Sequence, residues 1–186
     1  MAAETTILTL LGSLRRQSVN GRLLDLAAGY APDGTRFTRW AGLRDLPPFS
    51  EDDEADPGHA VFELRDVIAA ADAVLIATPE YNGSLPGQLK NALDWASRPR
   101  GAAALDGKPV TVIGASPSPG GTASAQEHAR VVLTRSGARP VGEGLRVPHA
   151  YDVLGAPVAG WLASGLTAVL AELTDAATAG SRALVA

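Results

Sequence analysis

Short apolar runs, each followed by a polar or glycine-rich loop and then by an amphipathic segment, constrain the fold of this chain most. The clearest runs are residues 7–11, 73–77 and 110–114. Their nearly continuous apolar character is typical of strands buried on both faces of a parallel sheet. Residues 36–40 alternate polar and apolar side chains and predict an edge strand, and residues 139–147 predict a last, interrupted strand.

Apolar residues recur at helical spacing after every predicted strand and therefore predict five helices. The residues that show this spacing lie within 23–28, 61–71, 89–96, 125–137 and 158–177. We expect an α/β fold, a three-layer flavodoxin-like sandwich whose five-stranded parallel sheet has the order 2-1-3-4-5 and carries helices on both faces. The chain shows no internal repeat and no long linker, so residues 1–186 are expected to form a single domain.

Composition and charge exclude several classes of function. The net charge of -4 at pH 7 gives no electrostatic reason to expect a nucleic acid or an anionic membrane as partner. The absence of cysteine excludes disulfides, thiolate zinc sites and cysteine catalysis, and 3 scattered histidines do not make a metal-binding set. The amino terminus lacks the basic start of a signal peptide, and no apolar run approaches the roughly 18 residues of a membrane helix. A soluble, cytoplasmic protein is therefore expected, with the acidic run at 51–54 solvated.

The loop after the first predicted strand carries hydroxyl, amide and cationic side chains, namely Ser13, Arg15, Arg16, Ser18 and Asn20. Because this loop precedes a helix, its free backbone N–H groups, hydroxyls and arginines predict an anion site suited to phosphate. The alternative is that Ser18 caps the helix and that the arginines are merely solvated. The loop alone leaves both interpretations open.

The loop after residues 73–77 is the most unusual segment, because Pro79, Glu80, Tyr81, Asn82 and Gly83 follow one another with no aliphatic residue until Leu85. In open α/β sheets, ligands bind at the carboxyl ends of the strands, where this loop lies. Taken singly, Tyr81 is better explained as a packing residue, and Glu80 is equally well explained as a surface carboxylate. Together the five residues favour a ligand-binding loop.

A third loop, residues 115–122, follows the fourth predicted strand and is rich in serine, proline and glycine. In the strand order 2-1-3-4-5, the strands that precede the three loops are neighbours, so the loops are expected to converge. The chain contains neither the G-x-G-x-x-G fingerprint of dinucleotide sites nor the P-loop motif. These loops fit a mononucleotide such as FMN, with its single phosphate beside Arg15 and its planar ring against residues 79–83. Gly83 and Gly120 would allow such a flat ligand to approach the backbone closely.

Two segments, residues 12–18 (GSLRRQS) and residues 79–95 (PEYNGSLPGQLKNALDW), resemble the signatures of the NADPH-dependent FMN reductase family. That family includes quinone, chromate and azo-dye reductases on a flavodoxin-like fold, and the likeness spans about residues 6–137. By this resemblance Ser13, Arg15, Ser18 and Asn20 would bind the FMN phosphate. Residues 79–83 would line the ribityl chain and the isoalloxazine, and Ser116 would bring the third loop to the flavin. The sequence departs from the family pattern at Ser118, Thr122 and Ser124, which puts the third loop's conformation in question.

The resemblance implies an enzyme in which FMN receives a hydride from NADPH or NADH and passes it to a quinone, an azo compound, a metal oxyanion or free flavin. The flavin carries this chemistry, so no protein residue is expected to act as an obligatory acid or base. The resemblance also implies a homodimer or homotetramer with residues 90–95 near the interface, and it allows a flavin-dependent monooxygenase as partner. Two alternatives stay open: an FMN-binding electron carrier or redox sensor without NAD(P)H turnover, and a scaffold without flavin.

Overall fold

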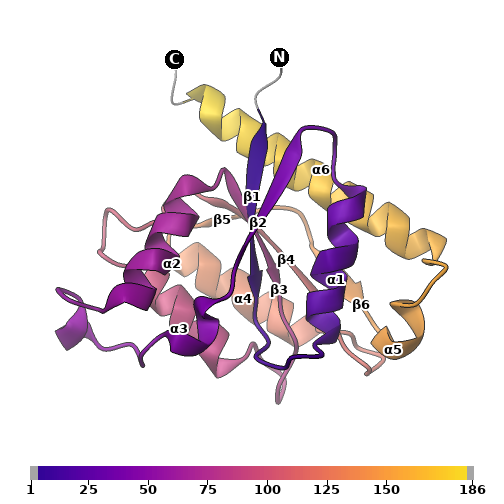
Figure 1. The fold of residues 1–186 in the computed structure, drawn as a ribbon, viewed down its shortest axis with the longest axis horizontal. Coiled ribbons are helices and arrows are strands. Elements are labelled where there is room, and N and C mark those ends of the chain that lie inside the picture. Colours follow the sequence, from indigo (N-terminus) through magenta and orange to yellow (C-terminus); the bar gives the residue numbers. More distant parts are fainter. Residues whose placement is uncertain (1–3, 184–186) are drawn as a thin grey trace.

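The computed structural model describes residues 4–183, and its centre is a parallel sheet of the predicted order (Figure 1). Going across the sheet the order is β2-β1-β3-β4-β5, with β6 also paired to β4, and every pairing is parallel. The strands are β1 (Thr5–Leu11), β2 (Thr35–Trp40), β3 (Ala73–Ala77), β4 (Pro109–Ala115), β5 (Arg139–Pro140) and β6 (Leu145–Val147). The predicted strands and their order are confirmed, with β2 at the edge.

Helices cover both faces of this sheet. The α-helices are α1 (Val19–Ala27), α2 (His59–Ala70), α3 (Gly87–Ala96), α4 (Ala123–Arg135), α5 (Ala150–Val153) and α6 (Gly160–Ala183), and the 3₁₀ turns are η1 (Ala28–Tyr30), η2 (Gly42–Asp45) and η3 (Glu51–Asp53). Helices α2, α3 and α4 pack on one face, while α1 and α6 pack on the other (Figure 1). Helix α6 extends past the predicted end at 177 to Ala183, and the first two residues beyond Ala177, Thr178 and Ala179, are exposed. The short α5 was not predicted.

The two-residue period of the strands divides the core between these faces. In β3, Val74 and Ile76 pack with α2, α3 and α4, whereas Ala73, Leu75 and Ala77 pack with α1 and α6. All five side chains are fully buried. This double burial explains why the strand shows a continuous apolar run in the sequence.

The last strand is interrupted, as predicted. β5 pairs with the beginning of β4, and β6 pairs with its end. Between them Gly142 and Gly144 have positive φ angles of 61° and 76°. A side chain at Gly144 would collide with the carbonyl oxygen of Val112, so the chain crosses close to β4 only because this residue is glycine.

The excursion between β2 and α2 is held in place by the polar side of α3. Gln88 donates to the carbonyl oxygens of Leu43 and Leu46 at 2.9 and 3.3 Å. Asn91 donates to the carbonyl oxygen of Pro47 at 2.8 Å and accepts from the backbone N–H of Phe49 at 2.7 Å. The segment is irregular, as predicted, but side-chain hydrogen bonds fix it.

The acidic run is only partly solvated, which corrects the prediction for residues 51–54. Arg98 donates to Glu54 at 2.6 Å and to Glu51 at 3.0 Å, and its own side chain is only 12% exposed. Its guanidinium also lies over the ring of Phe49. Two of the acids therefore anchor the excursion to the end of α3.

Among the helices of residues 4–183, none combines the length and the apolar character needed to cross a membrane.

Candidate functional site

The three predicted loops meet at the carboxyl edge of the sheet. They enclose a small pocket of about 90 Å³. Its lining residues are Ser13, Arg15, Ser18, Val19, Asn20, Pro79, Glu80, Tyr81, Ala115, Ser116 and Pro117. Eight of the ten residues predicted from the sequence are among them, and the other two, Asn82 and Gly83, continue the second loop. Three segments that lie apart in the chain, residues 13–20, 79–81 and 115–117, are thus brought together by the order of β1, β3 and β4.

The first loop ends in a capped helix with unused hydrogen-bond donors. Ser18 is the N-cap of α1, and its hydroxyl oxygen accepts from the backbone N–H of Asn20 at 3.2 Å, so the capping interpretation is confirmed. Within residues 4–183 the N–H groups of Arg16, Gln17 and Ser18 have no acceptor. The guanidinium of Arg15 makes only a long bond to the carbonyl oxygen of Gln17 and no ion pair with a described carboxylate. Capping and anion binding are therefore compatible here.

Asn20 ties the first loop to the third. Its side chain is 1% exposed. Its amide nitrogen donates to the carbonyl oxygen of Ala115 at 2.9 Å, and its amide oxygen accepts from the N–H of the same residue at 2.8 Å. Both the nitrogen and the oxygen of the amide are bonded to the end of β4, so Asn20 positions the first and third loops around the pocket.

The second loop forms a tight turn that exposes backbone donors. Tyr81 and Ser84 pair with each other in an antiparallel bridge. Between them Asn82 and Gly83 have φ angles of 53° and 75°, the left-handed conformations of a two-residue hairpin turn. Within the described chain the N–H groups of Glu80, Asn82 and Gly83 have no acceptor. The side chain of Tyr81 is 48% exposed, and its hydroxyl makes no hydrogen bond to the described residues.

Glu80 is not a free surface carboxylate. Its Oε2 accepts from the backbone N–H of Ala125, in the first turn of α4, at 3.1 Å. A second contact joins the same two elements: Nδ1 of His128 lies 3.1 Å from the hydroxyl of Ser84. Sequence reasoning missed both links, because nothing in the local pattern pairs residues 44 or 45 positions apart.

The third loop offers fewer donors than the other two. Pro117 and Pro119 have no N–H, and the N–H groups of Ser116, Ser118 and Gly121 bind acceptors within the protein. The hydroxyl of Ser116 lies 3.0 Å from that of Ser118 and accepts from its N–H. Ser118, one of the departures from the family pattern, therefore folds this loop locally onto Ser116.

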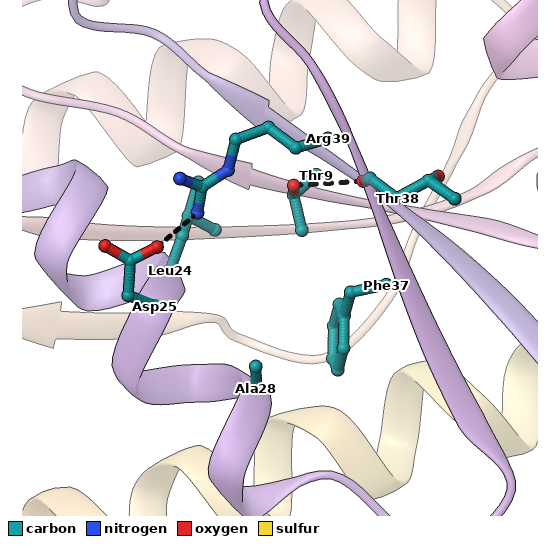
Figure 2. A pocket seen from close by; sticks show the side chains of 7 residues that line it. All are labelled: Thr9, Leu24, Asp25, Ala28, Phe37, Thr38 and Arg39. Carbon is teal, nitrogen blue, oxygen red and sulfur yellow. Dashed lines mark hydrogen bonds and ion pairs between the residues drawn. The ribbon is translucent and has the colours of Figure 1, made fainter.

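Larger hollows lie away from this edge. One of about 230 Å³, shown in Figure 2, lies between α1 and the edge strand β2, with Leu24, Ala28 and Phe37 on its walls. An ion pair of 2.8 Å between Arg39 and Asp25 lies across it. Another, of about 430 Å³, includes Lys108.

Lys108 binds the carboxyl end of α2, so its ammonium is engaged in a structural contact. Its ammonium donates to the carbonyl oxygens of Ala69 and Ala71 at the end of α2, and burial lowers its pKa. Neither of these two hollows is lined by the backbone N–H groups without acceptors that lie at the carboxyl edge. Among the described residues, no group of acidic and histidine side chains could hold a metal ion.

A doubly wound parallel sheet with a ligand edge of this kind defines a mononucleotide-binding protein of the flavodoxin-like class. The donor set fits FMN. The first loop suits a phosphate because it offers hydroxyls, free N–H groups and Arg15. The turn at residues 80–83 presents further free N–H groups, and Gly83 has no side chain that would keep a ligand away from them.

The comparisons with known proteins identify the family. Residues 5–152 match the NADPH-dependent FMN reductase family, and the chain belongs to it. A 2-hydroxy-1,4-benzoquinone reductase from a Burkholderia species is 46% identical over 126 residues, which is 68% of each protein. An NAD(P)H-dependent FMN reductase from Pseudomonas aeruginosa is 42% identical over 77% of each protein.

A solved structure agrees with this assignment. The flavoenzyme NAD(P)H:acceptor oxidoreductase FerB from Paracoccus denitrificans is 31% identical, superimposes with a TM-score of 0.76, and is matched over 92% of this chain and 98% of its own. The protein is an oxidoreductase that uses FMN and NAD(P)H.

Proposed function

We propose that this protein is an NAD(P)H-dependent quinone reductase. FMN, when bound, supplies the hydride chemistry, accepting a hydride from NADPH or NADH and delivering it to the quinone. The observation that carries the proposal is the convergence of three loops at one edge of the sheet. In the first two loops several backbone N–H groups have no acceptor among the described residues, and the guanidinium of Arg15 makes only one long bond, to the carbonyl oxygen of Gln17. The names of the relatives support a quinone as acceptor.

The residues divide the binding task between two ends of the ligand. Ser13, Arg15 and Ser18, with the free N–H groups at the start of α1, hold the phosphate, while Asn20 fixes this loop to β4. Pro79, Tyr81, Asn82 and Gly83 lie along the ribityl chain and the ring, and Ser116 closes the site. The unbonded N–H groups of Asn82 and Gly83 favour negative charge on the ring, a role for which the third loop has few donors.

The proposal extends to the whole molecule. Residues 1–186 form a single FMN-binding domain of a cytoplasmic homodimer or homotetramer. Azo compounds, metal oxyanions and free flavin are further acceptors to test, the last in partnership with a flavin-dependent monooxygenase. Exposed apolar side chains on α2, α4 and α6, namely Phe62, Val131 and Trp161, are available for contacts between subunits.

The decisive experiment follows the visible flavin band without oxygen. The protein is loaded with FMN, NADPH or NADH is added, and a benzoquinone is then supplied. We expect the band to bleach on a catalytic timescale and to return on addition of the quinone. A bound flavin that resists both nucleotides would indicate an electron carrier or sensor instead, and a failure to bind FMN would refute the assignment.

The phosphate site is tested by comparing FMN with riboflavin, which lacks the phosphate. Arg15→Gln removes a charge-assisted bond, worth about 1.5–3 kcal/mol, so FMN affinity is expected to fall roughly tenfold or more while riboflavin affinity stays unchanged. Arg16→Gln is the matched control, since Arg16 does not line the pocket. Equal losses for both ligands would show that Arg15 does not contact the phosphate.

A further inference from the structure

Helix α4 begins without a cap from its own sequence. The residue before it, Thr122, makes no side-chain capping bond, and the first turn contains no acidic residue. The hydroxyl of Thr122 is instead buried against Gly114 and accepts from the side-chain amide of Gln126 at 2.8 Å. The unpaired N–H groups of this helix end therefore need an acceptor from elsewhere.

Glu80 supplies that acceptor from the second loop. Its carboxylate accepts from the N–H of Ala125 at 3.1 Å, which is the only acceptor this N–H has in the described structure. A negative charge at a helix amino terminus is stabilised by the helix dipole, and a bond from an N–H to a carboxylate is stronger than one between neutral groups.

We propose that Glu80 is a positioning residue that acts on the flavin through α4, rather than a flavin ligand. The third loop starts at the end of β4, which the sheet fixes, and finishes at the start of α4, where Glu80 is bonded. The bond to Ala125, beside the contact between Ser84 and His128, thus links the position of residues 116–122 to the turn at 80–83. This inference rests on FMN as the cofactor but not on the identity of the acceptor.

The test uses the apoprotein first, so that its outcome does not depend on turnover. Amide hydrogen exchange at Ala125 is measured for the wild type, for Glu80→Ala and for Glu80→Gln, whose amide oxygen can still accept. We expect roughly tenfold faster exchange in E80A, which corresponds to about 1.4 kcal/mol and lies within the range for loss of a cap, and a change within about threefold in E80Q. Glu127→Gln is the control for Glu80→Gln. It removes the same negative charge, but from a side chain on α4 that has no partner in the described structure.

FMN affinity is then measured for the same variants. E80A is expected to bind FMN about tenfold more weakly, with E80Q and E127Q within about threefold of the wild type. Unchanged exchange at Ala125 in E80A, or unchanged FMN affinity despite faster exchange, would overturn the proposal. A loss of FMN affinity in E80Q with Ala125 still protected would also overturn it, because the charge itself would then be acting on the ligand. Should E80A fail to fold, E80Q decides alone: retention of both properties supports the positioning role.

Discussion

At the scale of single residues, the site depends on side chains that hold backbone in place as much as on those that face the ligand. The nitrogen and the oxygen of the Asn20 amide each bond to Ala115, and one carboxylate oxygen of Glu80 accepts from Ala125. Both residues were predicted from the sequence as flavin contacts. The structure places both at the pocket wall, with their polar atoms directed to the protein.

Replacement of Asn20 is therefore expected to reduce stability as well as FMN binding. Asn20→Ala leaves the buried N–H and carbonyl of Ala115 without partners, so the free energy of unfolding should fall by about 2–4 kcal/mol. Asn20→Asp should also destabilise, because it places a carboxylate oxygen against the carbonyl oxygen of Ala115. Urea denaturation of the apoprotein measures both, with Gln17→Ala, an exposed change in the same loop, as control. An effect of N20A below about 0.5 kcal/mol would contradict the tie between the loops.

At the scale of secondary-structure elements, the two sides of α3 have different tasks. The i,i+4 pair of Lys90 and Asp94 lies on the exposed side of α3 at 2.6 Å. Gln88, Asn91 and Trp95 bind the backbone of the excursion on its other side. One helix thus combines a solvated face with a face that organises a distant loop.

These two faces should respond differently to mutation. Asn91→Ala removes one bond to Pro47 and one to Phe49, and should lower the free energy of unfolding by about 1–3 kcal/mol. Lys90→Ala, on the same helix, removes a surface pair worth about 0.3–0.5 kcal/mol. Chemical denaturation of the two variants side by side measures the difference. Similar losses would show that the excursion does not depend on Asn91.

Gly114 provides a second test at this scale. A methyl group there would lie 2.5 Å from the carbonyl oxygen of Thr78 and collide with the hydroxyl of Thr122. Gly114→Ala is expected to destabilise the protein by about 1–3 kcal/mol and to weaken FMN binding, because it separates the bases of the second and third loops. Gly120→Ala, where no atom lies within 4 Å of the new methyl group, is the control. Thermal unfolding and FMN titration of both variants measure their stability and FMN affinity. A Gly114→Ala variant as stable as the wild type and with unchanged FMN affinity would contradict this prediction.

At the scale of the whole molecule, the two faces of the sheet are filled by apolar side chains, and polar chemistry is confined to the loop edges. The carboxyl edge carries unpaired donors, whereas at the opposite edge Lys108 is occupied by the end of α2. The loops of the carboxyl edge are joined to one another and to the sheet, so a ligand that fills their pocket contacts three separate parts of the fold.

FMN should therefore stabilise the entire fold rather than one loop. At a free FMN concentration of 100 times its dissociation constant, binding adds about 2.7 kcal/mol, which for a chain of this size raises the melting temperature by roughly 5–10 °C. Differential scanning calorimetry with and without FMN measures the shift. AMP, which carries a phosphate but no flavin ring, is the control, and no shift with FMN would contradict the proposed site.

The sequence by itself determined the strands, their parallel order and the loops that carry the ligand chemistry. Burial on both faces forces continuous apolar runs such as residues 73–77, and a chain that alternates such runs with helices has few ways to pack. Residues 79–83 were recognisable because an apolar strand is followed there by a polar turn at the edge where α/β sheets bind ligands.

Only the tertiary structure decided which polar side chains remain free. Asn20 and Ala115 are 95 positions apart, and Glu80 and Ala125 are 45 apart. Helical and strand periodicity report only which face of its own element a residue occupies, so they cannot reveal such partners. Whether an amide or a carboxylate is left for a ligand depends on the groups that the completed fold brings within hydrogen-bond distance.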